Sequence, residues 1–330
     1  MKTPVVSVVI PVFNREDLVV KCLKTLFEQD FQEWEAIVVD DGSTDNTTAA
    51  LAELALDDKR ISLISRDPLT SSKGACSCRN IGLGLAVGKY VVFHDSDDLL
   101  HPRCLAQRVL RLEEEPDLDF VVSPTLVFRD SPEKVSGFLN FPYATPVSDM
   151  ARLLRHDSPW WTSGPTWRRS FLLEENLHWP EDWERWQDWR FNLEVLSRRP
   201  RYKRLELFDT YYREGNEGIK GSPWNSSWVE RISGEYGALS KRFLSEGLVS
   251  AADVAEGAVS LVSMLQGRRQ FKKSRQVIES LNDVPREMRQ NIEKYARMNK
   301  VLSILFLGKG SRLRKEILRS FENKKDESQE

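Results

Sequence analysis

The sequence has 330 residues, and its 48 Lys and Arg residues nearly balance 50 Asp and Glu residues, which gives a formal net charge of -2. A chain of this length can bury a substantial core and form either one large domain with an appendage or two domains. Its longest late apolar run, Ile304-Leu305-Phe306-Leu307, is far too short to cross a bilayer, so no membrane-spanning segment is expected. The overall balance does not argue for a polyanion, and we predict no nucleic acid partner.

The charge is unevenly distributed along the chain. Residues 268–325 carry 17 Lys and Arg against 6 Asp and Glu, behind an acidic body. Such a region can contact an anionic membrane or a phosphate-bearing acceptor, or it can form solvated helix faces, and charge alone favours solvated faces. Cys76-Ser77-Cys78 lacks the spacing of a zinc or redox pair, so the four cysteines are interpreted as reduced thiols of a cytoplasmic protein.

The first half of the chain alternates predicted strands with predicted helices. Apolar and β-branched runs predict strands at 5–12, 36–39, 61–64 and 90–94. Helices are expected between them, with Asn14 and Ser43 as caps of the first two and 79–86 as the third. Connections of this length indicate a mostly parallel sheet, in which ligands bind beyond the carboxyl ends of the strands.

The second half begins with two more predicted strands, at 118–128 and 205–208, and two helices, at 148–155 and 186–197. Seven tryptophans lie between residues 160 and 189, and the pattern is helical beyond Trp228. We therefore predict a catalytic domain over 1–225 and a C-terminal helical region over 226–330.

Three carboxylates follow the apolar strand, in the sequence Asp95-Ser96-Asp97-Asp98. Carboxylates this close repel one another, and keeping them ionised calls for a cation. Oxygen ligands on a bent loop suit Mg²⁺ or Mn²⁺, which keep waters and accept diphosphate oxygens. Capping of the next helix would explain Asp98, but it leaves Asp95 and Asp97 unexplained. The sequence therefore predicts a divalent metal site.

Two other polar segments follow predicted strands. In Asp40-Asp41-Gly42-Ser43 a carboxylate can accept from a base N–H or a ribose hydroxyl, although a turn with a capping Ser43 explains its last two residues. Arg79-Asn80 starts a helix, where a cation and helical N–H groups suit a phosphate. Pairing of Arg79 with the acidic loop is an equally good interpretation.

In their order and spacing these segments resemble the family 2 glycosyltransferases over roughly residues 5–215. The matching segments are Val8–Asn14, Val38–Asp45, Arg79–Gly82 and Val92–Asp98. The resemblance implies a GT-A fold, which is an α/β fold with a Rossmann-like, mostly parallel sheet flanked by helices. It also implies a nucleotide-diphospho-sugar donor, most commonly a UDP-sugar, and inversion at the anomeric carbon.

The resemblance further implies roles for individual residues. The first five residues assigned to the donor would line or adjoin its nucleoside, and the others would face its ribose and phosphates. The residues assigned to the donor are Pro11, Phe13, Asn14, Asp40, Asp41, Arg79, Asn80, Asp95, Ser96 and Arg213, and those assigned to the metal are Asp95 and Asp97. Many relatives add a histidine just after the position of Arg213, and none stands there in this sequence, so the third metal ligand is not identified.

Family members carry an acidic pair that opens a late helix, and its Asp is the general base. Asp188 matches that position, with Gln187 in place of the usual Glu. Glu181-Asp182 looks closer to the motif in isolation, but only Asp188 is followed directly by an amphipathic helix, so we place the base there. A helix-terminal acid favoured by the macrodipole is the alternative interpretation of Asp188.

The implied mechanism is a direct displacement, in which Asp188 takes the proton of an acceptor hydroxyl. The metal and Arg213 or Arg79 would stabilise the departing diphosphate. The expected acceptor is a saccharide or a lipid-linked saccharide, in bacterial-type surface polysaccharide or glycan synthesis. Some of the clustered tryptophans could stack on its sugar rings, although tryptophans are more often core residues. The candidates are Trp160, Trp161 and Trp167.

Other functions fit the sequence less well. A nucleotidyltransferase would carry a glycine-rich loop after the first strand, and a dehydrogenase would carry a G-x-G-x-x-G segment there, but the turn Phe13-Asn14-Arg15 contains no glycine. A glycosyltransferase-like scaffold that binds donor without turnover stays open because of Gln187 and the missing histidine.

The C-terminal helices have two interpretations. They can pack on the catalytic domain or form a homodimer, or their basic stripe can lie on the inner face of a membrane that holds a lipid-linked acceptor. Packing is slightly favoured. The stripe consists of Arg312, Arg314, Lys315 and Arg319 beside Leu313, Ile317 and Phe321.

Overall fold

The computed structural model describes residues 3–67, 69, 71–139, 147–183, 185–215 and 226–305. The chain divides into two compact units. The first consists of Met1–Ala144 and Trp160–Gly221, and the second of Thr145–Pro159 and Ser222–Glu330. The second unit therefore includes Thr145–Pro159, which lies inside the domain predicted over 1–225.

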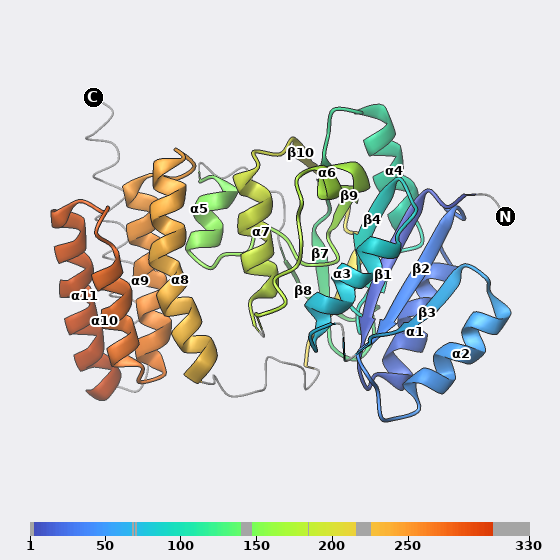
Figure 1. The fold of residues 1–330 in the computed structure, drawn as a ribbon, viewed down its shortest axis with the longest axis horizontal. Helices are drawn as coiled ribbons and strands as arrows, with labels where there is room; N and C mark the ends of the chain where they lie inside the picture. Colours follow the sequence, from blue (N-terminus) through green and yellow to red (C-terminus); the bar gives the residue numbers. More distant parts are fainter. Residues whose placement is uncertain are drawn as a thin grey trace. The chain divides into compact units, whose positions relative to one another are not determined.

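The first unit contains a large mixed sheet (Figure 1). Within the described residues its strands are β1 (Val6–Val12), β2 (Trp34–Asp40), β3 (Ile61–Ser65), β4 (Tyr90–Phe93), β6 (Phe120–Val122), β9 (Pro165–Arg168) and β10 (Tyr202–Arg204), in the order β10-β6-β9-β4-β1-β2-β3. The pairings of β1 with β2 and β4, of β2 with β3, and of β6 with β10 are parallel, whereas β9 runs antiparallel to β4 and β6. The predicted α/β fold with a mostly parallel sheet is confirmed.

Helices cover both faces of this sheet. They are α1 (Glu16–Phe27), α2 (Thr47–Asp57), α3 (Ala75–Leu85), α4 (Cys104–Glu114), α6 (Arg169–Glu174) and α7 (Gln187–Ser197). Because side chains alternate along a strand, β1 contacts different helices on its two faces. Val8 and Ile10 join the core under α1 and α4, while Val9 packs against α3. All seven residues of β1 are buried, as expected for a strand covered on both sides.

A smaller sheet accompanies the large one. In the described part of the chain it contains β5 (Leu99–Leu100), β7 (Thr125–Phe128), β8 (Val135–Leu139) and β11 (Thr210–Arg213), in the order β5-β11-β7-β8. The single strand predicted over 118–128 is wrong, since it is two strands in different sheets. Pro124 lies at the break and lacks the N–H that a continuous ladder needs, and Ser123 bonds instead to the carbonyl of Gly164. The strand predicted over 205–208 is also wrong, because β10 precedes it.

The second unit is helical over its described residues. Its helices are α5 (Asp149–Leu154), α8 (Ser226–Ser245), α9 (Ala251–Gly267), α10 (Phe271–Ser280) and α11 (Arg286–Leu305). All residues from Ala252 to Val262 are buried, so α9 is the central helix, and it packs against α5, α10 and α11. Arg155, just after α5, forms ion pairs with Asp253 and Glu256 of α9.

The basic stripe predicted to contact a membrane, from Arg312 to Phe321, lies outside the described residues. Among those that are described, no helix combines the length and the apolar character that crossing a bilayer requires.

The two glycines of α3 allow a matched test of its packing. An added Cβ at Gly82 would overlap with the side chain of Val9, whereas nothing lies within 4 Å of the same atom at Gly84. We expect Gly82→Ala to lower the free energy of unfolding by about 1–3 kcal/mol because the contact is overpacked. Gly84→Ala should raise it by about 0.5–1 kcal/mol because alanine has the better helix propensity. Urea unfolding followed by circular dichroism measures both, and equal effects of the two variants would contradict the packing.

Candidate functional site

The turns after β1 and β2 are joined at the carboxyl edge of the large sheet. Asn14 has a positive φ of 50°, a conformation that asparagine tolerates better than most residues. Its backbone N–H donates to Oγ of Ser43 at 3.0 Å, and its Oδ1 accepts from the N–H of Thr44 at 2.8 Å. Asn14 and Ser43 therefore tie the two turns together. Their predicted capping roles are wrong, since Arg15 and Asn46 precede the first helical residues.

The predicted nucleoside residues lie around these two turns. Pro11 is buried in β1, whereas Phe13 is 39% exposed and has the ammonium of Lys73 4.6 Å from its ring centre. Asp40 is buried and accepts from the N–H and the hydroxyl of Ser43, so this carboxylate holds its own turn. The structure thus brings together the residues that were predicted to surround the base.

Asp41 has a partner that the sequence analysis missed. Its Oδ1 is paired with Nε of Arg66, both side chains are only 8% exposed, and Nη1 of Arg66 also donates to the carbonyl of Ser71. Arg66 directly follows β3, the neighbour of β2, so its position at a strand end was the available signal. The pair neutralises Asp41 and fixes its orientation.

The acidic loop follows β4. Asp95 is half-buried, and its Oδ1 accepts from Nη2 of Arg79 at 2.5 Å. Ser96 is buried and Asp97 is half-buried. Arg79 therefore compensates one of the clustered charges. The structure therefore shows the pairing of Arg79 with the acidic loop that was considered as an alternative. The contact of Arg79 with donor phosphates stays a prediction.

Asp98 is a structural carboxylate. It is buried and accepts from the N–H of Arg213 at 3.1 Å and from the indole N–H of Trp161 at 3.2 Å. Burial, together with the charges of Asp95 and Asp97, raises the pKa of Asp98. The next helix, α4, has Arg103 at its N-cap, so the capping role considered for Asp98 is wrong.

Arg79 connects this loop to α7. The Arg79 side chain is buried, its Nη1 donates to Oε1 of Gln187 at 3.3 Å, and its guanidinium carbon lies 4.3 Å from the ring centre of Trp179. Gln187 thus offers a neutral acceptor where the family pattern has a Glu. The neighbouring Asn80 bonds to Trp179 and Glu181, so its amide faces the segment that precedes α7.

Asp188 lies in the first turn of α7, within electrostatic range of Arg79 and Asp95. Loss of surrounding water raises the pKa of Asp188, an effect opposed by the N–H of Trp189 and by Arg79. A raised pKa makes the carboxylate a stronger base. The rival Asp182 is exposed. The start of α7 therefore places Asp188 within electrostatic range of the acidic loop.

Arg213 ends β11 beside the same loop, where its Nε donates to the carbonyl of Asp97 at 3.1 Å. Behind it, Arg108 and Asp209 form an ion pair with no exposed side-chain surface. Nε of Arg108 lies 2.8 Å from Oδ2 of Asp209, and its Nη1 donates to the carbonyl of Ser163 at 3.0 Å. This pair fixes the start of β11, and sequence patterns gave no signal for it because its partners lie on separate elements.

The prediction that tryptophans stack on the acceptor is wrong for two of the three candidates. Trp160 and Trp167 are buried and pack on Phe120 in the core. Trp161 is half-buried beside Tyr212, with ring centres 4.3 Å apart. Of the three, Trp161 alone is placed to offer a surface near the acidic loop.

No group of three or more His, Cys, Asp or Glu side chains within the described ranges is arranged to hold a metal ion. Asp95 and Asp97 are the candidates, since Asp98 is occupied by N–H donors. Two carboxylates suit Mg²⁺ or Mn²⁺ when substrate oxygens and water complete the coordination. The residues present therefore fit a metal that is shared with a diphosphate.

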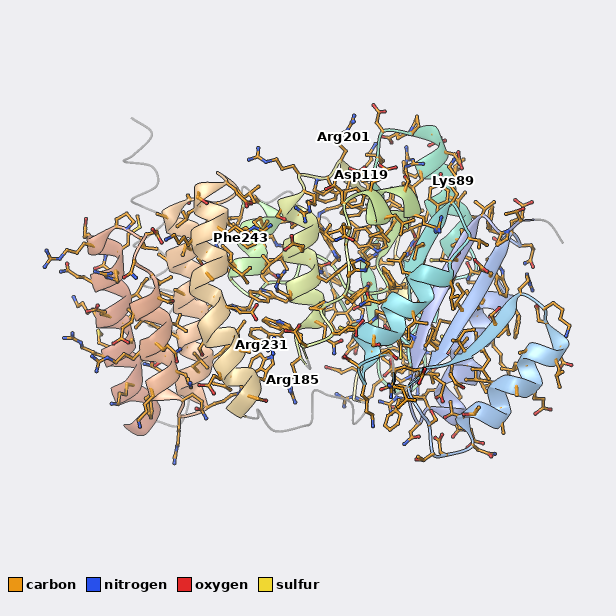
Figure 2. All side chains as sticks on the ribbon, in the orientation of Figure 1. Lys89, Asp119, Arg185, Arg201, Arg231 and Phe243 are labelled. Carbon is orange, nitrogen blue, oxygen red and sulfur yellow. The ribbon has the colours of Figure 1, made fainter. Side chains whose placement is uncertain are left out.

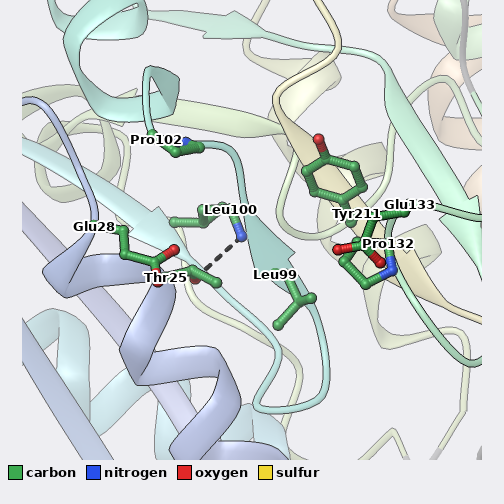
Figure 3. A pocket seen from close by; sticks show the side chains of 8 residues that line it. All are labelled: Thr25, Glu28, Leu99, Leu100, Pro102, Pro132, Glu133 and Tyr211. Atoms are coloured by element: carbon green, nitrogen blue, oxygen red, sulfur yellow. Dashed lines mark hydrogen bonds between the residues drawn. The ribbon is translucent and has the colours of Figure 1, made fainter.

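A separate hollow of about 280 Å³ lies at the far end of α1 (Figure 3). It is lined by Thr25, Glu28, Leu99, Leu100, Pro102, Pro132, Glu133 and Tyr211. None of the residues predicted to bind donor or metal contributes to it.

Comparisons with known proteins identify the family of the chain. The family described as glycosyl transferase family 2 matches residues 7–171. The chain is similar to the uncharacterized glycosyltransferase EpsJ of Bacillus subtilis, with 27% identity over 255 residues that cover 75% of this chain and 72% of EpsJ.

Two solved structures share the fold. S. aureus TarS 1-349 in complex with UDP-GlcNAc superposes with a TM-score of 0.69 at 22% identity, over 93% of this chain and 91% of that one. The mannosyltransferase PcManGT from Pyrobaculum calidifontis, in complex with GDP-Man and Mn²⁺, gives a TM-score of 0.53 at 18% identity, over 97% and 86% of the two chains. At these identities the likeness establishes the fold.

The chain belongs to glycosyl transferase family 2. The function predicted from the sequence, that of a glycosyltransferase using a nucleotide-sugar, is confirmed at the level of the family.

The buried ion pair behind the site can be tested by stability. Arg108→Met should lower the free energy of unfolding by about 3–5 kcal/mol, because it leaves Asp209 buried without its partner. The control is Arg201→Met, on the surface of the first unit (Figure 2), where the side chains of Arg201 and Asp117 are 69% and 82% exposed. That variant should leave the urea midpoint nearly unchanged. Similar losses in both variants would show that the buried pair has no special weight.

Proposed function

We propose that this enzyme transfers a sugar, with inversion, from a UDP-sugar to a saccharide or lipid-linked saccharide in surface polysaccharide or glycan synthesis. The structural likeness to TarS in complex with UDP-GlcNAc supports UDP as the nucleotide. The acceptor class rests on the family resemblance. The observation that carries the proposal is the bridge made by Arg79, which joins Asp95 of the acidic loop to Gln187 beside Asp188.

In the proposed mechanism Asp188 takes the proton from the acceptor hydroxyl as its oxygen attacks the sugar C1 from the face opposite the diphosphate. The raised pKa of Asp188 supports this role. Arg213 uses Nε to hold the acidic loop, which leaves its Nη groups for the departing diphosphate. The turns at Phe13, Asn14 and Asp41 would hold the nucleoside, with Arg66 keeping Asp41 in place.

We further propose that a divalent cation, Mg²⁺ or Mn²⁺, is held by Asp95 and Asp97 when the donor is bound. Such an ion supplies charge neutralisation at the diphosphate. The Mn²⁺ in the related mannosyltransferase structure supports this choice of metal. Because Arg79 already neutralises Asp95, metal affinity should depend strongly on the donor.

The cellular location belongs to the same proposal. The enzyme would act in the cytoplasm, peripherally on the inner face of the membrane if its acceptor is lipid-linked. The four cysteines are free and buried, as expected in a reducing compartment. Membrane contact through the basic C-terminal residues, and a homodimer, stay predictions.

The alternative of an inactive scaffold rested partly on Gln187. In the structure this residue accepts a hydrogen bond from Arg79, so the exchange of Glu for Gln keeps the contact that orders the start of α7. This favours an active enzyme over a scaffold.

Asp188→Asn should leave the dissociation constant of UDP-GlcNAc within about threefold and lower its turnover by roughly 10²–10⁴, the usual weight of a general base. Turnover can be measured as UDP release with water as the acceptor, and binding by calorimetry. Asp182→Asn is the control and should retain turnover, because Asp182 is exposed. The opposite ranking would move the base to Asp182.

The metal is tested by thermal shift. UDP-GlcNAc should raise the melting temperature more with Mn²⁺ than with EDTA, because a ligand that binds only the folded state stabilises it. Asp97→Asn should remove the difference between the two conditions. Asp57→Asn, which changes an exposed carboxylate on α2, should preserve it. A donor shift that is identical with Mn²⁺ and EDTA in the unmodified protein would rule out the metal.

A further inference from the structure

The side-chain amide of Asn80, a half-buried residue, makes three hydrogen bonds. Its Oδ1 accepts from the backbone N–H of Trp179 at 2.8 Å, and its Nδ2 donates to the carbonyl of the same residue at 2.9 Å. The other N–H of Nδ2 donates to Oε1 of Glu181 at 2.9 Å. The side-chain amide therefore pairs with one backbone residue as a neighbouring strand would, and it uses both of its donors.

The ring of Trp179, whose backbone is held by Asn80, packs against α7. It is 3% exposed and stacks on Phe191 with an interplanar angle of 4° and a centroid distance of 4.3 Å. Phe191 lies on α7 three residues after Asp188, so the two residues are neighbours about one helical turn apart. Trp179 also makes a T-shaped contact with Phe93 at the end of β4, and the two ring centres lie 5.3 Å apart.

Arg79 adds a second connection from the same point of α3. Its guanidinium lies over Trp179, and it bonds to both Gln187 and Asp95. Adjacent residues of α3 thus hold the segment before α7, the start of α7 and the acidic loop. These contacts connect the start of the helix that carries Asp188 to the acidic loop.

We propose that Asn80 is a positioning residue, which fixes Trp179 and through it the helix that carries Asp188, and that it is not a contact of the donor. The proposal rests on the proposed role of Asp188 as the base. All three hydrogen bonds of the Asn80 amide are made to Trp179 and Glu181, and they use both of its N–H donors.

The chemistry explains why asparagine is needed here. An aspartate has no N–H, so it would lose the bond to the carbonyl of Trp179 and would face the carboxylate of Glu181. An alanine would lose all three bonds. A displacement of a reacting group by as little as 1 Å can lower a reaction rate by about 10²-fold.

The experiment separates turnover from binding in the full chain, with UDP-GlcNAc as the probe and UDP release to water as the readout. Asn80→Asp should lower kcat by roughly 10²-fold with the donor dissociation constant within about threefold. Glu181→Gln, the matched control, keeps an acceptor for the amide and should retain kcat. In the double variant, the amide introduced by Glu181→Gln can donate to the carboxylate introduced by Asn80→Asp, which restores one bond with its direction reversed. The double variant should recover about tenfold of the lost kcat.

Each outcome has a distinct meaning. A donor dissociation constant that rises tenfold or more in Asn80→Asp, with kcat retained, would make Asn80 a donor contact and overturn the proposal. Absence of any recovery in the double variant would overturn the pairing with Glu181. If Asn80→Asp does not fold, as judged by circular dichroism, Glu181→Ala removes one of the three bonds and should lower kcat about threefold, and an unchanged kcat would count against the proposal. Failure of Asp188→Asn to lower turnover would instead refute the base assignment, independently of these results.

Discussion

The repulsion among Asp95, Asp97 and Asp98 is the constraint on which the site depends. The structure relieves it in a different way at each residue. Asp95 is paired with Arg79, and Asp98 is buried among N–H donors from Arg213 and Trp161. Asp97 is half-buried, and its backbone carbonyl accepts from Nε of Arg213. Since the partners come from α3, β11 and the segment before β9, the charges also decide which elements must meet at this edge of the sheet.

Sequence patterns were sufficient for the elements whose side chains repeat regularly. The buried strands β1, β2 and β4 were predicted from continuous apolar and β-branched runs, and α7 was predicted from its amphipathic pattern. Antiparallel β9 was missed. It contains Pro165 and Trp167 in a tryptophan-rich stretch, and its burial arises from Phe120 and Tyr90 on neighbouring strands, which no local period reveals.

For the candidate site, the sequence indicated which residues gather but not how they bond. Strand ends predicted that Asn14, Asp41 and Asp95 would share one edge, because the carboxyl ends of parallel strands coincide. The partners Ser163 and Trp179 could not be found in this way, since each is fixed by contacts with residues far along the chain. The hydrogen bonds of Asn80 and Asp98 could not be predicted for the same reason, because they run to distant segments.

The buried pair of Arg108 and Asp209 also restricts which mutations this sequence can accept during evolution. Either residue alone cannot be exchanged for an uncharged one without leaving an isolated charge in the core. A single mutation in this pair therefore lowers stability strongly, and an apolar replacement avoids that loss only when both residues change. Because Asp209 directly precedes β11, the pair also anchors the strand that reaches the acidic loop through Arg213. β8, which belongs to the same sheet, is partly exposed and contains no charged residue, so this restriction does not apply to it.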